Sequence, residues 1–248
     1  MLLQNKTAVV TGCNRGIGKA VLEVFAENGA DIIACARKES HEYSDWTARV
    51  AEQTGVSITL VYFDFSESEQ VKAGIRTIIA SKKKIDVLVN NAAVAAGSFF
   101  QMTSLNDLKQ VFEINFFSQI LFTQGISRYM SRFKAGSIIN IASTAGLIGD
   151  AGTTSYGSSK AALMFATRTM ATELGEMNIR VNAIAPSITK TDMFDQMEEK
   201  ARNKLIESSA LKRPAEAIEV ANAVLFLASD LSSFVTGQVL RVDGGLTK

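Results

Sequence analysis

Short apolar runs alternate with longer amphipathic stretches along the whole of this 248-residue chain. The short runs are rich in β-branched residues and predict seven strands, at residues 7–11, 31–36, 58–63, 85–90, 137–142, 180–184 and 238–242. The longer stretches predict helices near residues 17–28, 42–53, 67–82, 105–132, 157–177, 198–208 and 216–228. Strands that alternate with helices of this length form parallel βαβ units. The pattern therefore predicts an α/β doubly wound Rossmann fold, with a seven-stranded, mostly parallel sheet flanked by helices on both faces.

The alternation continues without an internal repeat, a low-complexity tract or a shift in composition, so we expect a single domain over residues 1–248. The two prolines, Pro186 and Pro214, bracket a long polar segment with weak periodicity. Such segments often lie as a lid over a rigid scaffold, and we expect a substrate lid at about residues 187–213. An ordinary pair of surface helices is the alternative.

Composition and charge exclude several classes of protein. The 26 basic residues nearly balance the 25 acidic ones, so nothing favours a nucleic-acid partner. No apolar run approaches the length of a membrane span, and the N-terminal residues lack the pattern of a signal peptide. Two cysteines make no disulfide framework, and we expect a cytoplasmic protein. A single histidine, His41, argues against a zinc site and against a Ser-His-Asp triad, so no metal is expected.

A glycine-rich turn follows the first predicted strand. Residues 11–18 read T-G-C-N-R-G-I-G and lead directly into the first predicted helix. Glycines in this place allow a tight turn and let the backbone approach a diphosphate at the helix N-terminus, where free N–H groups meet negative charge. The sequence therefore predicts a dinucleotide-binding loop.

The end of the second predicted strand indicates which nicotinamide cofactor is bound. An acidic side chain there would hold the ribose 2′-hydroxyl of NAD, whereas an arginine suits the 2′-phosphate of NADP. This chain carries Arg37 at that point, and its first carboxylate is Glu39. Arg15 in the glycine loop would supply a second cation, and guanidinium–phosphate pairing favours NADP(H). In the alternative, Arg37 is merely solvated and Glu39 binds the ribose.

Tyr156 and Lys160 lie four residues apart in a predicted helix, with Ser143 thirteen residues upstream of the tyrosine. At this spacing the two side chains share one face of the helix. A nearby ammonium favours the phenolate, so the pair can form a proton-transfer group with a lowered tyrosine pKa. A solvated lysine one turn past a packed tyrosine is the structural alternative.

Together these motifs resemble the short-chain dehydrogenase/reductase family, over essentially the whole chain. Asn90-Asn91-Ala92-Ala93 resembles the family's N-N-A-G turn, Thr191-Asp192-Met193 its T-x-M step, and residues 236–245 its C-terminal end. The resemblance implies that the catalytic residues are Asn115, Ser143, Tyr156 and Lys160. It implies cofactor contacts from Gly12, Asn14, Arg15, Gly16, Ile17, Gly18, Arg37, Asp64, Phe65, Asn91, Ala92, Tyr156, Lys160, Pro186, Thr189 and Thr191.

Two residues depart from the family pattern. Ala93 replaces the glycine of N-N-A-G, and Ser187 replaces the glycine of P-G. If either position requires a positive φ, the replacement costs about 1 kcal/mol. We expect a local adjustment near the nicotinamide ribose rather than a loss of binding.

The family mechanism implies NADPH-dependent reduction of a carbonyl to an alcohol. Tyr156 would donate the proton, Ser143 would bind the carbonyl oxygen, Lys160 would bind the ribose, and Asn115 would hold a water that relays protons. Within the family the chain resembles bacterial 3-oxoacyl-acyl-carrier-protein reductases. Lys134 matches one basic position of their carrier-protein docking surface, but Met177 occupies the other.

Other substrates and functions stay open. A sugar, polyol or other ketone is the alternative substrate. The pocket is expected between residues 94–99, 147–152 and the lid, where Met193, Phe194 and Met197 are apolar. Asp150 would bond a hydroxylated substrate or simply form a turn. A non-catalytic NADP-sensing protein and a nucleotide-sugar epimerase are the rival classes.

Two predicted helices carry apolar residues on more than one face, for example Phe116, Phe117, Leu121 and Phe122. One stripe packs on the sheet, and a second would be exposed in a monomer. The family pairs these helices in dimers and its C-terminal strands in tetramers, so we expect a homodimer or homotetramer.

Overall fold

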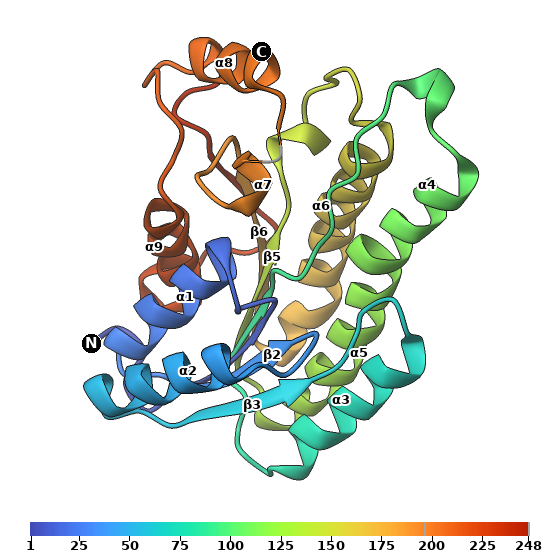
Figure 1. Ribbon diagram of the computed structural model, residues 1–248. Coiled ribbons are helices and arrows are strands. Elements are labelled where there is room, and N and C mark those ends of the chain that lie inside the picture. The colour runs from blue at the N-terminus through green and yellow to red at the C-terminus, as the bar shows by residue number, and fades with distance from the viewer. Residues whose placement is uncertain (196, 248) are drawn as a thin grey trace.

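Seven strands form one sheet in the computed structural model, which describes residues 1–195 and 197–247 apart from the side chain of Met193 (Figure 1). Within these residues the strands are β1 (Thr7–Thr11), β2 (Asp31–Ala36), β3 (Ile58–Tyr62), β4 (Val87–Asn90), β5 (Gly136–Ile141), β6 (Ile179–Pro186) and β7 (Val239–Val242). Their order is β3-β2-β1-β4-β5-β6-β7, and every neighbouring pair is parallel. The predicted Rossmann fold is confirmed, and the sheet is wholly parallel.

Helices cover both faces of this sheet. The helices α1 (Gly16–Glu27), α2 (His41–Thr54) and α9 (Ala217–Ala228) pack on one face, and α3 (Ser68–Ala80), α5 (Ser118–Met130) and α6 (Thr154–Leu174) on the other. Further helices are α4 (Leu105–Phe112), which leads towards α5, and α7 (Asp192–Asp195) and α8 (Glu199–Ser208), which follow β6. The strand order reverses between β1 and β4, and in such sheets ligands bind beyond the carboxyl ends of the strands at this point.

The central strands are buried on both faces, as their continuous apolar runs predict. In β1, Ala8 and Val10 pack against α1 and its neighbours, while Val9 packs against the opposite helical layer. In β4, Val89 and Leu88 divide in the same way. Successive side chains of a strand point to opposite faces, so a strand between two helical layers needs apolar residues at every position.

The long helix predicted over residues 105–132 is interrupted. A π-helical turn at Glu113–Phe117 separates α4 from α5, and the N–H of Ser118 bonds the carbonyl of Glu113 five residues back. This turn contains one residue more than a turn of α-helix. The residues after it therefore lie on different faces of the helix from those that a regular α-helix would give. The apolar pattern does not reveal such an insertion, because apolar residues occupy both faces.

The segment after β6 carries α7 and α8 and is anchored at both of its ends. The N–H of Lys190 donates to the carbonyl of Ala215, and the N–H of Ala215 donates to the carbonyl of Ile188. Near the other end, Leu211 N–H donates to the carbonyl of Gly244 at 3.0 Å. The described residues of α8 include none that is buried. Gln196 and the Met193 side chain, part of the expected lid, lie outside the described residues.

None of the described helices combines the length and the apolar character that a membrane crossing requires. Within the same residues, no group of three or more His, Cys, Asp or Glu side chains is arranged to hold a metal ion.

Candidate active site

The glycine loop between β1 and α1 has a shape that only glycine permits at two positions. Gly12 has φ +66°, and a Cβ there would lie 2.8 Å from the Cα of Ala92. A Cβ on Gly18 would lie 2.2 Å from the carbonyl oxygen of Gly12. The N-cap of α1, Arg15, provides no side-chain cap for the first N–H groups of the helix. These free donors fit a diphosphate, the group that the glycine pattern predicts.

Two side chains join the glycine loop to the turn after β4. The hydroxyl of Thr11 accepts hydrogen bonds from the N–H groups of Asn91 and Ala92 at 2.9 and 3.0 Å. The Asn91 amide in turn donates to the carbonyls of Thr11 and Gly12 at 3.0 and 2.9 Å. The carboxyl ends of β1 and β4 are thereby held together on either side of the switch point. Asn91 is among the cofactor contacts predicted from the sequence, whereas Thr11, a polar residue at the end of an otherwise apolar strand, is not.

The ends of β2 and β3 form the part of the site where the sequence predicts the adenosine. Arg37 is exposed and has no ion-pair partner among the described residues, whereas Arg15 pairs with Asp192 of α7 at 2.9 Å. The Asp64 carboxylate accepts from the N–H and hydroxyl of Ser66, and Phe65 is buried. The hydroxyl of Tyr62 is shielded from solvent without a hydrogen-bond partner in the described protein. An unpaired buried hydroxyl at this point fits a site completed by a polar ligand.

Ser143 and Tyr156 are brought together as the motif predicts. Ser143 lies two residues beyond the end of β5, where its hydroxyl accepts from the N–H of Ala145 at 3.1 Å. Tyr156 lies in the first turn of α6 and is half-buried, and its hydroxyl is close enough to that of Ser143 for Ser143 to lower the tyrosine pKa. The two hydroxyls can therefore contact one atom of a substrate, such as a carbonyl oxygen.

Lys160 is buried one turn along α6, with 1 % of its surface exposed. Its Nζ donates to the carbonyl of Ile141 at 2.7 Å and lies 5.8 Å from the ring centroid of Tyr156. Burial lowers the pKa of Lys160 to about 7. An ammonium has three donors, so two remain for a ligand after the bond to Ile141.

The pKa of Tyr156 is shifted upwards, whereas the tyrosine–lysine spacing predicts a downward shift. Burial raises this pKa, and the hydrogen bond with Ser143 lowers it only in part. The prediction was wrong because removal of water from the phenol is the largest effect on its pKa, while burial also lowers the pKa of Lys160 and so weakens its charge. Tyr156 is therefore a neutral phenol at pH 7, which is the form that can donate a proton.

Asn115 lies in the π-helical turn and is fully buried. Its Oδ1 accepts from the N–H of Val94 at 2.9 Å, and its Nδ2 donates to the carbonyl of Val94 and to Ser159 Oγ. Ser159 Oγ donates in turn to the carbonyl of Tyr156 at 2.7 Å. Asn115 thus fixes both the chain after β4 and the first turn of α6, and one lone pair of its Oδ1 remains for a water.

The two departures from the family motif cause no backbone strain. Neither Ala93 nor Ser187 is among the residues with a positive φ. The conditional cost of about 1 kcal/mol therefore does not arise. Ser187 nevertheless differs from glycine in one respect, because its Oγ is shielded from solvent and has no hydrogen-bond partner in the described structure.

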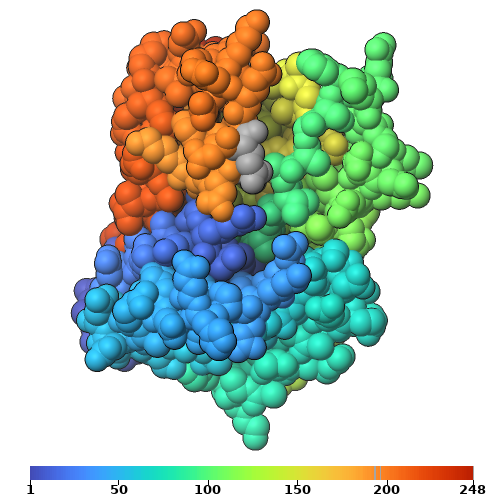
Figure 2. All heavy atoms as spheres, viewed as in Figure 1, coloured from blue at the N-terminus to red at the C-terminus, as the bar shows by residue number. Residues whose placement is uncertain are grey.

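The expected pocket walls meet above the carboxyl ends of the strands. A Cβ on Gly97 would lie 3.3 Å from the carbonyl oxygen of Gly152, so the loop after β4 contacts the turn before α6. Asp150 is part of this turn, and its carbonyl accepts from Thr153 Oγ1 at 2.7 Å. Figure 2 shows a hollow between the green loop after β4, the orange segment after β6 and the blue N-terminal part.

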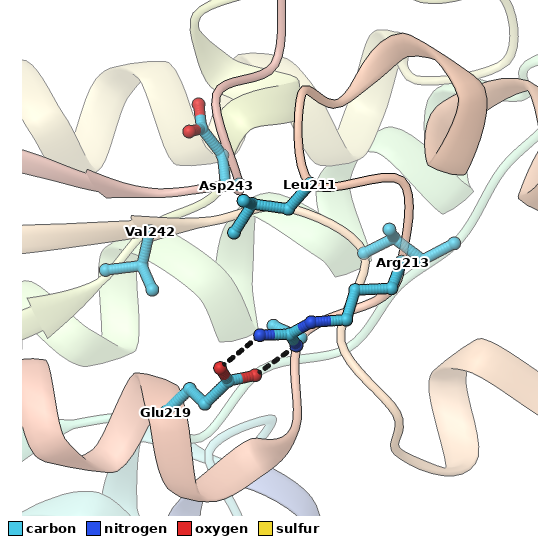
Figure 3. Close-up of a pocket in the computed structure, with 8 residues that line it drawn as sticks. Leu211, Arg213, Glu219, Val242 and Asp243 are labelled. Atoms are coloured by element: carbon cyan, nitrogen blue, oxygen red, sulfur yellow. Dashed lines mark hydrogen bonds and ion pairs between the residues drawn. The ribbon is translucent and has the colours of Figure 1, made fainter.

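A separate cavity lies at the base of the segment after β6. Ile188, Leu211, Ala215 and Val242 are among the residues that line it. Arg213 crosses one side and makes two hydrogen bonds of 2.7 Å with Glu219 on α9, which hold the pKa of Glu219 at about 2 (Figure 3). The volume of this cavity, about 90 Å³, is far below the roughly 300–1,000 Å³ of small-molecule sites. This cavity belongs to the attachment of the segment rather than to the site around Tyr156.

A buried network of hydrogen-bonded side chains lies behind the site and was not predicted from the sequence. Asn90 Nδ2 donates to Thr123 Oγ1 and to Asn140 Oδ1, both at 2.8 Å, and Asn140 Nδ2 donates to Thr167 Oγ1 at 2.9 Å. The network ties β4 and β5 to α5 and α6. An asparagine at the same point of two apolar strands was the signal that could have indicated it.

The two cysteines are free and buried beside the glycine loop. Cys13 Sγ lies 3.0 Å from Tyr43 Oη, and burial raises the pKa of Cys13 to about 11. A thiol with this pKa is neutral at pH 7 and a poor nucleophile.

Known proteins share this arrangement. A family model described as Enoyl-(Acyl carrier protein) reductase matches residues 12–247. The chain is 38% identical to the 3-oxoacyl-acyl-carrier-protein reductase FabG of Chlamydia trachomatis, over 99% of this chain and 98% of that protein. It is 35% identical to a 3alpha-hydroxysteroid dehydrogenase of Mediterraneibacter gnavus, over 98% of both chains. A doubly substituted short-chain dehydrogenase/reductase of Serratia marcescens superposes over both whole chains with a TM-score of 0.92 at 29% identity.

The chain therefore belongs to the short-chain dehydrogenase/reductase family, whose members are oxidoreductases that use NAD(P)(H).

Proposed function

We propose that this protein is an NADPH-dependent reductase that converts a carbonyl to an alcohol. The observation that carries the proposal is the arrangement of Ser143, Tyr156 and the buried amine of Lys160, whose Nζ lies 5.8 Å from the Tyr156 ring centroid. The glycine loop, the uncapped start of α1 and the unpaired hydroxyls of Tyr62 and Ser187 fit a bound dinucleotide. When bound, the cofactor supplies the hydride.

The side chains divide the remaining work. Tyr156, kept neutral by burial, donates its proton to the carbonyl oxygen. Ser143 donates a hydrogen bond to the same oxygen and stabilises its developing negative charge. Lys160 binds the ribose with the donors that Ile141 leaves free. Asn115 positions Val94 and the first turn of α6, and holds the water that returns a proton through Lys160.

Arg37 and Arg15 support NADP over NAD. Both guanidinium groups are exposed near the carboxyl ends of β1 and β2, and a 2′-phosphate is the ligand group that guanidinium pairs recognise best. Glu39, the carboxylate of the alternative reading, faces the Tyr62 hydroxyl closely enough to help raise its pKa.

A 3-oxoacyl thioester is the substrate class that we favour, because five FabG relatives are 36–38% identical over nearly the whole chain. A ring ketone is the second candidate, supported by the hydroxysteroid dehydrogenase relative. Lys134 and Met177 precede β5 and β6, at the edge of the sheet opposite Tyr156.

Tyr156→Phe tests the proposed chemistry. The variant lacks the donated proton but keeps the ring, so we expect turnover to fall by at least about a thousandfold with NADPH affinity nearly unchanged. Purified enzyme is assayed by NADPH oxidation across acyl thioesters, sugars, quinones and ketones, and NADPH binding by fluorescence titration. Wild-type binding of NADPH without oxidation of it across the panel would instead indicate a sensing protein, and appreciable turnover by Tyr156→Phe would refute the role of Tyr156.

A further inference from the structure

The Ser187 hydroxyl is a buried polar group that no other described residue hydrogen-bonds. Its Oγ is shielded from solvent and has no hydrogen-bond partner. Buried hydroxyls are nearly always paired, and an unpaired one costs free energy of folding. The family motif that the sequence resembles has a glycine at this position, so the motif itself requires no hydroxyl here. An unpaired buried donor that replaces a simpler residue indicates a ligand.

Hydrogen bonds hold the backbone on both sides of the Ser187 side chain, so the loop cannot move freely to give the hydroxyl another partner. Ser187 N–H donates to the carbonyl of Val242 at 3.2 Å, which continues the pairing of Pro186 with Val242. The Ser187 carbonyl accepts from Thr189 Oγ1 at 3.0 Å. Both backbone polar groups are thus satisfied, and the side-chain oxygen alone is left unpaired.

Ser187 lies between the reacting end of the site and the glycine loop. The N–H of Ala142, next to Ser143, donates to the carbonyl of Ile184 at 2.7 Å, so Ser143 and Ser187 leave neighbouring strands at the same edge of the sheet. Four residues further on, Thr191 faces the glycine loop, since a Cβ on Gly16 would lie 3.2 Å from its Cγ2. A dinucleotide that extends from the start of α1 to Tyr156 must pass beneath this segment.

We propose that Ser187 is a further cofactor-binding residue, whose hydroxyl hydrogen-bonds the carboxamide of the nicotinamide. A carboxamide has both a donor and an acceptor, so the Ser187 hydroxyl can accept a hydrogen bond from its NH₂ group or donate one to its oxygen. The bond fixes the rotation of the nicotinamide ring relative to Ser143 and Tyr156. This inference rests on the proposed function, because it requires a nicotinamide dinucleotide in the site.

The test compares two ligands that share the adenosine half. NADP⁺ carries the nicotinamide, whereas 2′,5′-ADP carries the adenosine 2′-phosphate without it. Isothermal titration calorimetry on the full chain should show that Ser187→Ala binds NADP⁺ about five- to tenfold more weakly than wild type, as the loss of one hydrogen bond predicts. Its affinity for 2′,5′-ADP should be unchanged. Ser187→Gly should repeat this result.

Ser131→Ala is the matched control, since Ser131 Oγ bonds the carbonyl of Ser127 at the far end of α5. It should bind both ligands as wild type does. The melting temperature without ligand gives a second readout: Ser187→Ala should melt no lower than wild type, because the removed hydroxyl had no partner. A lower melting temperature together with weaker binding of both ligands would show a structural role and overturn the inference.

Failure of the Ser187 inference can be distinguished from failure of the proposed function. If wild type binds both ligands but Ser187→Ala keeps full affinity for NADP⁺, the Ser187 inference is wrong and the proposed function stands. If wild type binds neither ligand, the proposed function itself fails, and the inference fails with it.

Discussion

Lys160 is a buried amine whose charge is set by its surroundings. Its Nζ has one protein partner, the carbonyl of Ile141, and its pKa is lowered from 10.5 to about 7 by burial. At neutral pH the amine is therefore divided between its charged and neutral forms. A group with this property suits a proton relay, because it can gain or lose a proton with little free-energy cost near pH 7.

The same shift predicts how stability depends on pH. Between about pH 7 and pH 10.5 the unfolded chain holds a proton on Lys160 that the folded chain lacks, so the free energy of unfolding rises with pH in this window. We expect wild type to gain about 2 kcal/mol more than Lys160→Met between pH 7 and pH 9. Urea unfolding of both proteins at the two pH values measures this difference. Equal pH dependence in the two proteins would show that the amine keeps an ordinary pKa.

At the scale of elements, the site depends on how closely the glycine loop packs against the turn after β4. Gly18, in the first turn of α1, lies against the carbonyl of Gly12 and the side chain of Asn91. That contact joins α1, β1 and β4 at the switch point of the sheet. The anion-binding end of α1 is thereby held in register with the strands that carry the rest of the site.

Gly18→Ala tests this packing. The added Cβ would lie 2.2 Å from Gly12 O and 2.4 Å from Asn91 Nδ2, so the loop or the helix must shift. We expect a loss of about 1–3 kcal/mol in the free energy of unfolding and a marked loss of NADPH affinity. Gly175→Ala is the control, since Gly175 has φ −59° and a Cβ there meets nothing within 4 Å. The control should be neutral or slightly stabilising; equal effects of the two variants would contradict the packing argument.

The π-helical turn shows a second element-scale effect. Asn115 can bond both backbone groups of Val94 because the inserted residue turns its side chain inward between α4 and α5. A regular helix over residues 105–132 would carry the following residues on other faces. Such turns are rare and frequently occur at functional sites, as here beside Tyr156.

At the scale of the whole molecule, several large apolar side chains among the described residues are exposed, and two groups of them lie on surfaces that could pair subunits. The first includes Phe117, 54 % exposed, and Phe165 on α6, 70 % exposed, and α6 packs directly against the π-helical turn. The second lies at the C-terminal end and includes Leu231 and Phe234, which is fully exposed. Exposed aromatic residues of this size favour association of subunits, so we propose a symmetric oligomer.

Substitution of one residue on each surface separates dimer from tetramer. Phe165→Lys places a charge at the centre of the first surface, and we expect the mass of the assembly to fall at least by half. Phe234→Lys should halve the mass of a tetramer and leave a dimer built on the first surface unchanged. Multi-angle light scattering at micromolar concentration measures both. A wild-type monomer under these conditions would refute the proposal.

The sequence by itself determined the order of strands and helices and the position of the glycine loop. These follow from local properties: apolar periodicity, β-branched runs, and glycines at the end of a strand. The bounds of β1 and β2 agree with the predicted ones, and the sites of Ser143 and Tyr156 come together as their motif indicates. A wholly parallel sheet with its switch point between β1 and β4 then places all of these residues at one edge.

Only the tertiary structure decided what depends on surroundings. Burial sets the pKa values of Tyr156 and Lys160, and the burial of a side chain is a property of its neighbours rather than of its spacing. The bonds of Asn115 to Val94 and the shielding of the Ser187 hydroxyl likewise depend on segments that meet only in the folded chain. No local pattern records such contacts, because they exist only after the strands and helices have packed together.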